Sequence, residues 1–156
     1  MMASHKGRDQ SLDINGNHFA LRTWGNERGY PVLALHGWLD NAASFERIAP
    51  LLHECFVVAP DLAGHGRSQH RRADSGYYLW EHADDMNALV ESLGWKRFSV
   101  LGHSMGTGVA SILAAMNRSI DSMVFLEGMG APFTLAEGST VEHLRKSQRL
   151  LRLRNT

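Results

Sequence analysis

A serine between two glycines is the strongest chemical signal in this 156-residue sequence. Ser104 stands in the run GHSMG at 102–106, which has the G-x-S-x-G pattern of a nucleophile elbow. An apolar run at 98–101 predicts a buried strand before it, and a helical pattern begins at about Met105. A glycine-rich turn with an incidental serine is the alternative. The strand and the helix on either side favour Ser104 as a nucleophile held in a strained backbone conformation.

Acyl transfer at such a serine needs two backbone N–H groups that stabilise the oxyanion of the transition state. Met105, the residue after the nucleophile, is placed to supply one of them. The other should come from a loop after an earlier strand, and Trp38 follows the predicted strand at 32–35. An ordinary turn at the end of that strand is the alternative. We expect the N–H groups of Met105 and Trp38 to form the oxyanion hole.

Alternating strands and helices must position these groups. The pair Asn15-Gly16 predicts a hairpin over residues 11–24. Apolar patterning predicts strands at 32–35, 56–59, 98–101 and 122–126, and helices at 45–52, 79–93 and from about 105 to 116. This order predicts an α/β fold with a mostly parallel sheet covered by helices on both faces.

The run DLAGHGRS at 61–68 is a second glycine-rich segment. Its glycines permit a tight loop, and Asp61 can bind the backbone of that loop through an Asx-type hydrogen bond. The run lacks the Gly-Lys-Ser/Thr ending of a phosphate-binding loop, so nucleotide binding is not expected. We interpret this loop as structural.

Composition narrows the class of protein further. Lys plus Arg and Asp plus Glu number 16 each, so no net charge attracts nucleic acid or an anionic membrane. No apolar run is long enough for a membrane span, and the start of the chain has no apolar stretch typical of a signal peptide. A single cysteine, Cys55, allows no internal disulfide. There is no H-E-x-x-H motif and no Cys/His cluster, so no metal site is expected. We expect a cytoplasmic protein.

Three motifs in order, His36-Gly37, the run at 61–68 and the run at 102–106, resemble the α/β-hydrolase superfamily. Within it, the run LHGWLDNA at 35–42 together with the elbow is similar to the serine hydrolase-like proteins. The resemblance implies an eight-stranded sheet, no cofactor, a small-molecule acyl substrate, and a triad in the order serine, acid, histidine. The superfamily also includes dehalogenases and epoxide hydrolases, which form an alkyl-enzyme ester on a carboxylate nucleophile. Ser104 argues against both of these activities, because it is not a carboxylate.

The sequence departs from this pattern after the elbow. The resemblance implies a histidine after the last strand, yet only His143 of the nine histidines follows Ser104. We therefore expect an N-terminal portion truncated after about the sixth strand, with residues 1–133 in the hydrolase core and 134–156 beginning a lid. The basic amphipathic stretch at 141–154 fits a lid helix, with a membrane surface or an acidic partner as the alternative.

Two classes of function remain open at this stage. The chain is the front part of an esterase-like serine hydrolase, acting on a small ester, thioester or amide, and inactive alone because the triad histidine is missing. Alternatively, it is a non-catalytic, hydrolase-derived binding module or an inactive fragment.

Glu127 is the candidate for the triad acid. It follows the predicted strand at 122–126, beside the elbow strand, where parallel sheets collect functional groups. Most members of the superfamily carry the acid after the seventh strand, but some haloalkane dehalogenases carry a glutamate after the sixth. A carboxylate that binds loop amides or the substrate is an equally weighted alternative.

Overall fold

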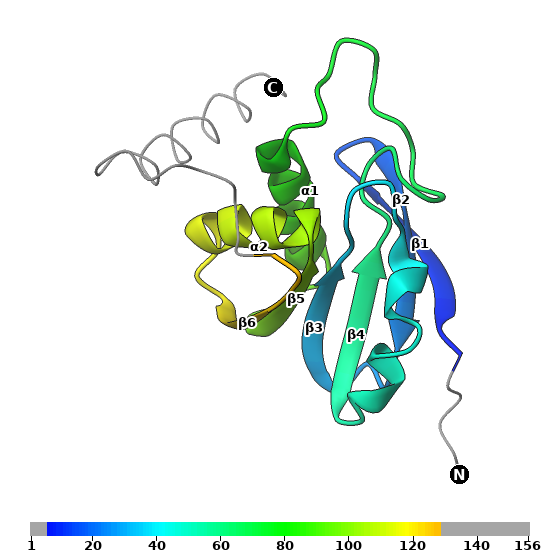
Figure 1. Cartoon of the computed structure of the whole chain (residues 1–156), viewed down its shortest axis with the longest axis vertical. Helices are drawn as coiled ribbons and strands as arrows, with labels where there is room; N and C mark the ends of the chain where they lie inside the picture. Colours follow the sequence, from blue (N-terminus) through cyan, green and yellow to red (C-terminus); the bar gives the residue numbers. More distant parts are fainter. Residues whose placement is uncertain (1–5, 129–156) are drawn as a thin grey trace.

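A computed structural model describes residues 6–128 as a six-stranded sheet with two helices and two short 3-10 segments (Figure 1). The elements are β1 (Arg8–Ile14), β2 (Asn17–Trp24), β3 (Tyr30–Leu35), η1 (Ala42–Phe45), η2 (Ala49–Leu51), β4 (Cys55–Pro60), α1 (Leu79–Ser92), β5 (Phe98–His103), α2 (Met105–Met116) and β6 (Ile120–Leu126). The strand order is β1-β2-β4-β3-β5-β6. β1, β2 and β4 pair antiparallel, and β4, β3, β5 and β6 pair parallel. The predicted α/β class and mostly parallel sheet are confirmed.

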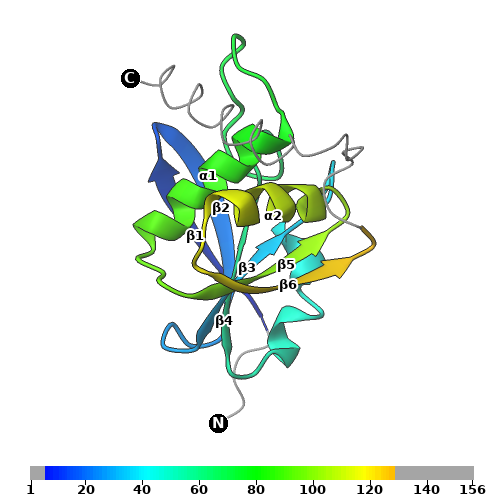
Figure 2. The same ribbon diagram turned by 90° about the vertical axis from the view of Figure 1, so that its left-hand side faces the viewer.

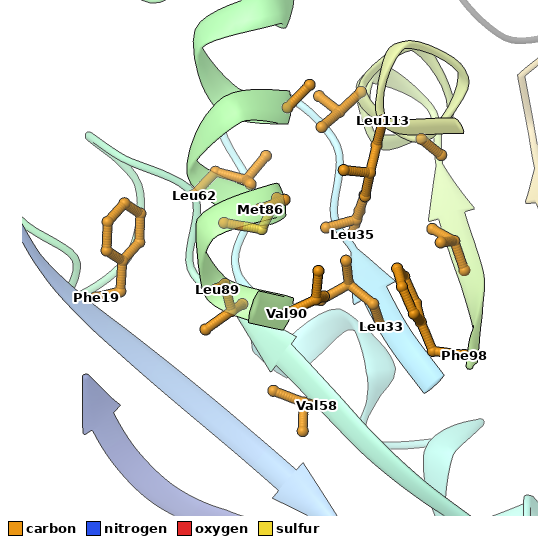
Figure 3. Packing of buried hydrophobic residues seen from close by; sticks show 14 of the residues in the cluster. Phe19, Leu33, Leu35, Val58, Leu62, Met86, Leu89, Val90, Phe98 and Leu113 are labelled. Carbon is orange, nitrogen blue, oxygen red and sulfur yellow. The ribbon is translucent and has the colours of Figure 1, made fainter. Parts of the chain in front are cut away.

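The two faces of the sheet are covered differently. α1 and α2 lie side by side on one face (Figure 2). Their apolar residues pack with strand residues in the larger cluster, in which Leu33, Met86 and Leu113 are fully buried (Figure 3). Burial of each such side chain contributes about 1.5–3 kcal/mol. The other face carries a smaller cluster that includes Phe45 of η1 and Ala49 of η2.

The predicted helix at 45–52 is wrong. The chain forms η1 and η2 there, separated by turn residues 46–48. Pro50 explains the difference, because it has no amide hydrogen and its ring would clash with the carbonyl of Glu46 in a continuous α-helix. Phe45 and Ala49 still reach the core, but Leu51 is exposed. The apolar spacing therefore predicted the burial of Phe45 correctly and was wrong about Leu51 and about the helix.

The other predicted elements are present with shifted ends. The hairpin turns at Asn15 and Gly16, both with positive φ. Gly94, also with positive φ, follows the end of α1. The predicted boundary at residue 133, the lid at 134–156 and His143 lie outside the described residues. Within residues 6–128, no helix has the length and apolar character that a membrane crossing requires.

Candidate active site

Ser104 occupies the sharp turn between β5 and α2. Its φ is 49° and its ψ is −116°, a conformation that L-residues rarely adopt. A Cβ at Gly106 would overlap the backbone carbonyl of Leu35, and one at Gly102 would lie 3.0 Å from the Cα of Thr107. Both glycines are therefore needed for the turn to pack against β3 and α2. The predicted strand, tight turn and helix are confirmed, and the turn leaves Ser104 exposed.

Hydrogen bonds hold this strained turn in place. The N–H of Ser104 donates to the carbonyl of Leu126, at the end of β6, over 3.0 Å. The Ser104 carbonyl accepts from the N–H of Thr107 at 2.9 Å and from its hydroxyl at 2.7 Å. These bonds use the backbone groups of Ser104 and leave its hydroxyl free among the described residues. The hydroxyl is therefore available to a ligand.

All four predicted site residues, Trp38, Ser104, Met105 and Glu127, line one pocket of about 790 Å³. Strained backbone is concentrated there. In residues 6–128, four residues other than glycine have a positive φ, and three of them, Leu39, Ser104 and Glu127, line this pocket. The fourth is the hairpin residue Asn15. Such strain persists only where surrounding structure enforces it, and it is typical of functional sites.

The two predicted oxyanion donors come from different elements that meet at the elbow. Met105 is the first residue of α2, so its N–H has no acceptor within the helix. The N–H of Trp38 likewise donates to no acceptor in residues 6–128. The loop of Trp38 runs against the elbow, since a Cβ at Gly37 would lie 3.3 Å from the Cβ of Ser104. Both residues line the same pocket as Ser104.

The loops beside the elbow are fixed by buried polar side chains. Asp61 accepts hydrogen bonds from the N–H of Ala42 at 2.7 Å and from the N–H of Arg67 at 2.8 Å. His36 is fully buried; its Nδ1 lies 2.7 Å from the Gly37 carbonyl, and its Nε2 accepts from the N–H of Leu62 at 2.9 Å. Burial lowers the pKa of His36, so the ring is neutral. The structural role expected for the 61–68 loop is thus supported by its contacts.

Glu127 follows β6 directly, and its side chain is 88% exposed. Its Oε2 lies 3.6 Å from Nε2 of His103, the residue before the serine. His103 points toward Glu127 and Gly37, and it makes no hydrogen bond to the Ser104 hydroxyl. The structure brings Glu127 to the pocket rim next to the elbow without joining it to a base among the described residues.

The sequence analysis did not assign four ring-bearing residues of the pocket to the site, His65, His70, Tyr77 and His82. His65 belongs to the loop after β4, Tyr77 precedes α1, and His82 lies on the buried side of α1. A signal for His82 was present, because it precedes the core residue Met86 by one helical turn. Within the described part of the chain, no three His, Cys, Asp or Glu side chains are grouped so that they could hold a metal ion.

Comparison with known proteins agrees with this architecture. The sequence profile of the alpha/beta hydrolase fold matches residues 30–151. The chain belongs to the α/β-hydrolase family. Among its relatives in this family is the human serine hydrolase-like protein, 40% identical over 135 residues that make up 85% of this chain. A soluble epoxide hydrolase from Corynebacterium sp. strain C12 is 36% identical over 117 residues, or 74% of this chain.

A solved structure is also similar. The crystal structure of a hypothetical protein from Pseudomonas aeruginosa PAO1 superimposes with a TM-score of 0.77 at 40% identity and covers 92% of this chain. The chain spans 65% of the human relative, 40% of the epoxide hydrolase and 52% of the Pseudomonas chain. The similarity thus concerns one part of each of these proteins.

Proposed function

We propose that the protein is a serine hydrolase that acts on a small ester, thioester or amide through an acyl-enzyme on Ser104. The observation that carries this proposal is the position of the serine. It stands exposed on a strained turn at the start of α2, in a pocket lined by Trp38 and Met105, whose N–H groups have no acceptors among the described residues. Nucleophile, oxyanion donors and substrate space are the parts that acyl transfer requires.

In the proposed reaction, the Ser104 oxygen attacks the substrate carbonyl while a base takes the hydroxyl proton. The N–H groups of Trp38 and Met105 stabilise the negative charge on the carbonyl oxygen. The bond to the leaving group then breaks, the base returns the proton to that group, and the acyl chain stays on Ser104. Water, deprotonated by the same base, releases the acid and restores the serine.

The base of this mechanism is proposed to lie outside residues 6–128. Within them, no histidine ring is hydrogen-bonded to the Ser104 hydroxyl, and the rings of His18, His36, His65, His70 and His103 lie against other groups. Glu127 is proposed as the acid that orients this base. Its exposure at the pocket rim leaves the carboxylate accessible to a histidine from another segment, and binding the substrate instead remains the alternative role.

Ester chemistry fits this site better than epoxide opening, although an epoxide hydrolase is among the relatives. Opening an epoxide through an alkyl-enzyme ester needs a carboxylate nucleophile, whereas the elbow of this chain carries a serine. The side chain on the strained turn is the hydroxyl of Ser104, and a hydroxyl forms an acyl ester with a carbonyl substrate.

A second candidate function is a non-catalytic binding module. The observation in its favour is that no histidine in the described residues reaches Ser104. Such a module would use the same pocket to hold a small acyl compound without cleaving it.

Labelling with a fluorophosphonate probe separates the two candidates. In the full-length gene product, a serine hydrolase should be labelled at Ser104, and the Ser104→Ala variant should lose the label. Ser111→Ala is the matched control, because this serine lies on α2 with its hydroxyl bonded to the Thr107 carbonyl. A folded full-length protein without labelling would support the binding module, and equal labelling of wild type and Ser104→Ala would remove Ser104 as the nucleophile.

A further inference from the structure

Thr107 contacts three segments that meet at the nucleophile turn. It is 1% exposed, and it lines the pocket of Ser104. A Cβ at Gly128, in the chain after β6, would overlap its hydroxyl, and one at Gly102 of β5 would lie 3.0 Å from its Cα. A β-branched side chain has few χ1 conformations, and these close neighbours restrict them further. The Thr107 hydroxyl is therefore held in place about one helical turn after the serine.

The bond from this hydroxyl to the Ser104 carbonyl replaces a bond that the backbone makes in the other helix. At the start of α1, the Tyr78 carbonyl accepts from the N–H groups of Glu81 and His82, at 3.0 and 3.2 Å. At the start of α2, the N–H of Thr107 is the one backbone donor to the Ser104 carbonyl among the described residues, at 2.9 Å. The Thr107 hydroxyl supplies the second bond, at 2.7 Å.

The carbonyl that Thr107 binds belongs to the same peptide as a proposed oxyanion donor. This peptide joins Ser104 to Met105 and is trans, so its C=O and N–H point in opposite directions. The carbonyl points into the first turn of α2, and the N–H of Met105 therefore points out of the helix at its N-terminus. Two hydrogen bonds to the carbonyl fix the plane of the peptide and polarise its N–H into a stronger donor.

The strained backbone of Ser104 needs such a restraint. Its φ of 49° and ψ of −116° persist only where neighbouring groups enforce them. The angle ψ sets the plane of the peptide that follows, so the Thr107 hydroxyl acts on the strained angle itself. The bond from the Ser104 N–H to the Leu126 carbonyl involves the preceding peptide and leaves ψ free.

We propose that Thr107 is a positioning residue of the oxyanion hole. Its hydroxyl holds the peptide between Ser104 and Met105 in the plane that directs the Met105 N–H at the developing oxyanion. The proposal rests on the proposed serine hydrolase function. The alternative is a local helical bond without effect on catalysis, like the bond from the Ser111 hydroxyl to the Thr107 carbonyl, 2.9 Å long, one turn further along α2.

The first test removes the hydroxyl and keeps the shape of the side chain. In the full-length protein, Thr107→Val should lower kcat for p-nitrophenyl hexanoate by on the order of 10- to 100-fold, with KM changed by less than about threefold, because the donor is misdirected in the transition state. Thr107→Ser keeps the hydroxyl and should retain kcat within about threefold of wild type. Ser111→Ala is the control and should leave kcat unchanged. Normal kcat in folded Thr107→Val would overturn the proposal.

A second pair of variants gives a result even where valine is not accommodated. Thr107→Ala and Thr107→Ser both lack the methyl group, and they differ only in the hydroxyl. The kcat of Thr107→Ala should be about tenfold or more below that of Thr107→Ser. Equal kcat values in this pair would contradict the role of the hydroxyl.

Two ketones separate an effect on the oxyanion from general damage to the pocket. A nucleophilic serine adds to 1,1,1-trifluoroheptan-2-one: the serine oxygen bonds to the carbonyl carbon, its proton passes to the base, and the carbonyl oxygen becomes an oxyanion. Heptan-2-one has the same chain and binds without addition. In Thr107→Val, the inhibition constant of the trifluoro ketone should rise by about the factor by which kcat/KM falls, while that of heptan-2-one changes by less than about threefold. Equal weakening of both ketones would leave Thr107 a structural role alone.

The rate of fluorophosphonate labelling distinguishes failure of this proposal from failure of the proposed function. Phosphonylation also develops negative charge on an oxygen, so Ser104 should be labelled about tenfold more slowly in Thr107→Val than in wild type. Equal rates would overturn the role of Thr107 and leave the hydrolase function standing. A wild-type protein without any label would instead remove the hydrolase function, and the role of Thr107 with it.

Discussion

Two carboxylates follow parallel strands of the same sheet, yet their surroundings are opposite. Asp61 comes directly after β4 and is buried, and its side chain accepts two backbone N–H groups. Glu127 comes directly after β6, with its side chain 88% exposed and His103 3.6 Å away. The backbone of Glu127 has a φ of 49°, whereas Asp61 has no such strain.

This difference distinguishes a structural carboxylate, Asp61, from a carboxylate that is accessible to a ligand or to another side chain, Glu127. Each carboxylate oxygen of the buried Asp61 accepts one backbone N–H, from Ala42 and from Arg67, so the side chain ties two loops together. Glu127 keeps its oxygens accessible at the pocket rim, held there by a backbone that is costly to form. Equivalent positions at the ends of parallel strands therefore do not imply equivalent roles. The partners of each side chain decide them.

The largest expected effect comes from removing the charge of the available carboxylate. In the full-length protein, Glu127→Gln should lower kcat by roughly 10²- to 10⁴-fold, because the triad histidine would lose the group that orients it and stabilises its cation. Stability should change by less than about 0.5 kcal/mol, as for an exposed side chain. Steady-state kinetics and thermal unfolding measure both quantities.

Glu54→Gln is the matched control for this variant, since Glu54 is also exposed and precedes β4 at the opposite end of the sheet. It should leave kcat and stability unchanged. Near-normal turnover in Glu127→Gln, together with a collapse on mutation of an aspartate elsewhere in the full-length protein, would return Glu127 to a structural or substrate-binding role.

A smaller effect is expected at the loop that Asp61 anchors. Trp38→Pro removes the proposed oxyanion donor and should lower kcat on the order of 100-fold, while Trp38→Phe keeps the N–H and should act mildly. The comparison between the two variants isolates the backbone group from the side chain, which is 72% exposed. Normal turnover in a folded Trp38→Pro protein would place the donor elsewhere.

Mutation of the structural carboxylate, Asp61, should mainly change the free energy of unfolding. Asp61→Asn replaces one acceptor oxygen by a donor that faces a backbone N–H, and it should destabilise the protein by about 2 to 4 kcal/mol. Its effect on kcat should stay below about tenfold. Denaturant unfolding measures the first quantity, with the exposed Asp13→Asn as control. A stable Asp61→Asn protein with strongly reduced kcat would reverse the roles assigned to the two carboxylates.

Local sequence predicted the elbow and the strands because local physics determines them. Gly102 and Gly106 allow the turn from β5 into α2 to pack closely against its neighbours, and the spacing of these glycines around Ser104 is visible in the sequence. The continuous apolar runs of β3, β4 and β5 require burial on both faces, which a parallel sheet provides.

Features that depend on distant contacts were not predicted. The strained backbone of Leu39 has no marker in its residue type. His65 comes from the loop after β4 and His82 from α1, and only the packed fold brings their rings together. The helix error at 45–52 was different, since Pro50 is visible in the sequence and disfavours a continuous helix through this segment.

The central claim is that Ser104 carries an acyl group during turnover. Rapid quenching of the full-length protein with p-nitrophenyl hexanoate, followed by mass spectrometry of its peptides, tests this directly. We predict a transient hexanoyl adduct on the peptide that contains Ser104, which decays as hexanoate forms and is absent from Ser104→Ala. Hydrolysis of the ester without any adduct on that peptide, or an equal adduct in Ser104→Ala, would contradict the claim.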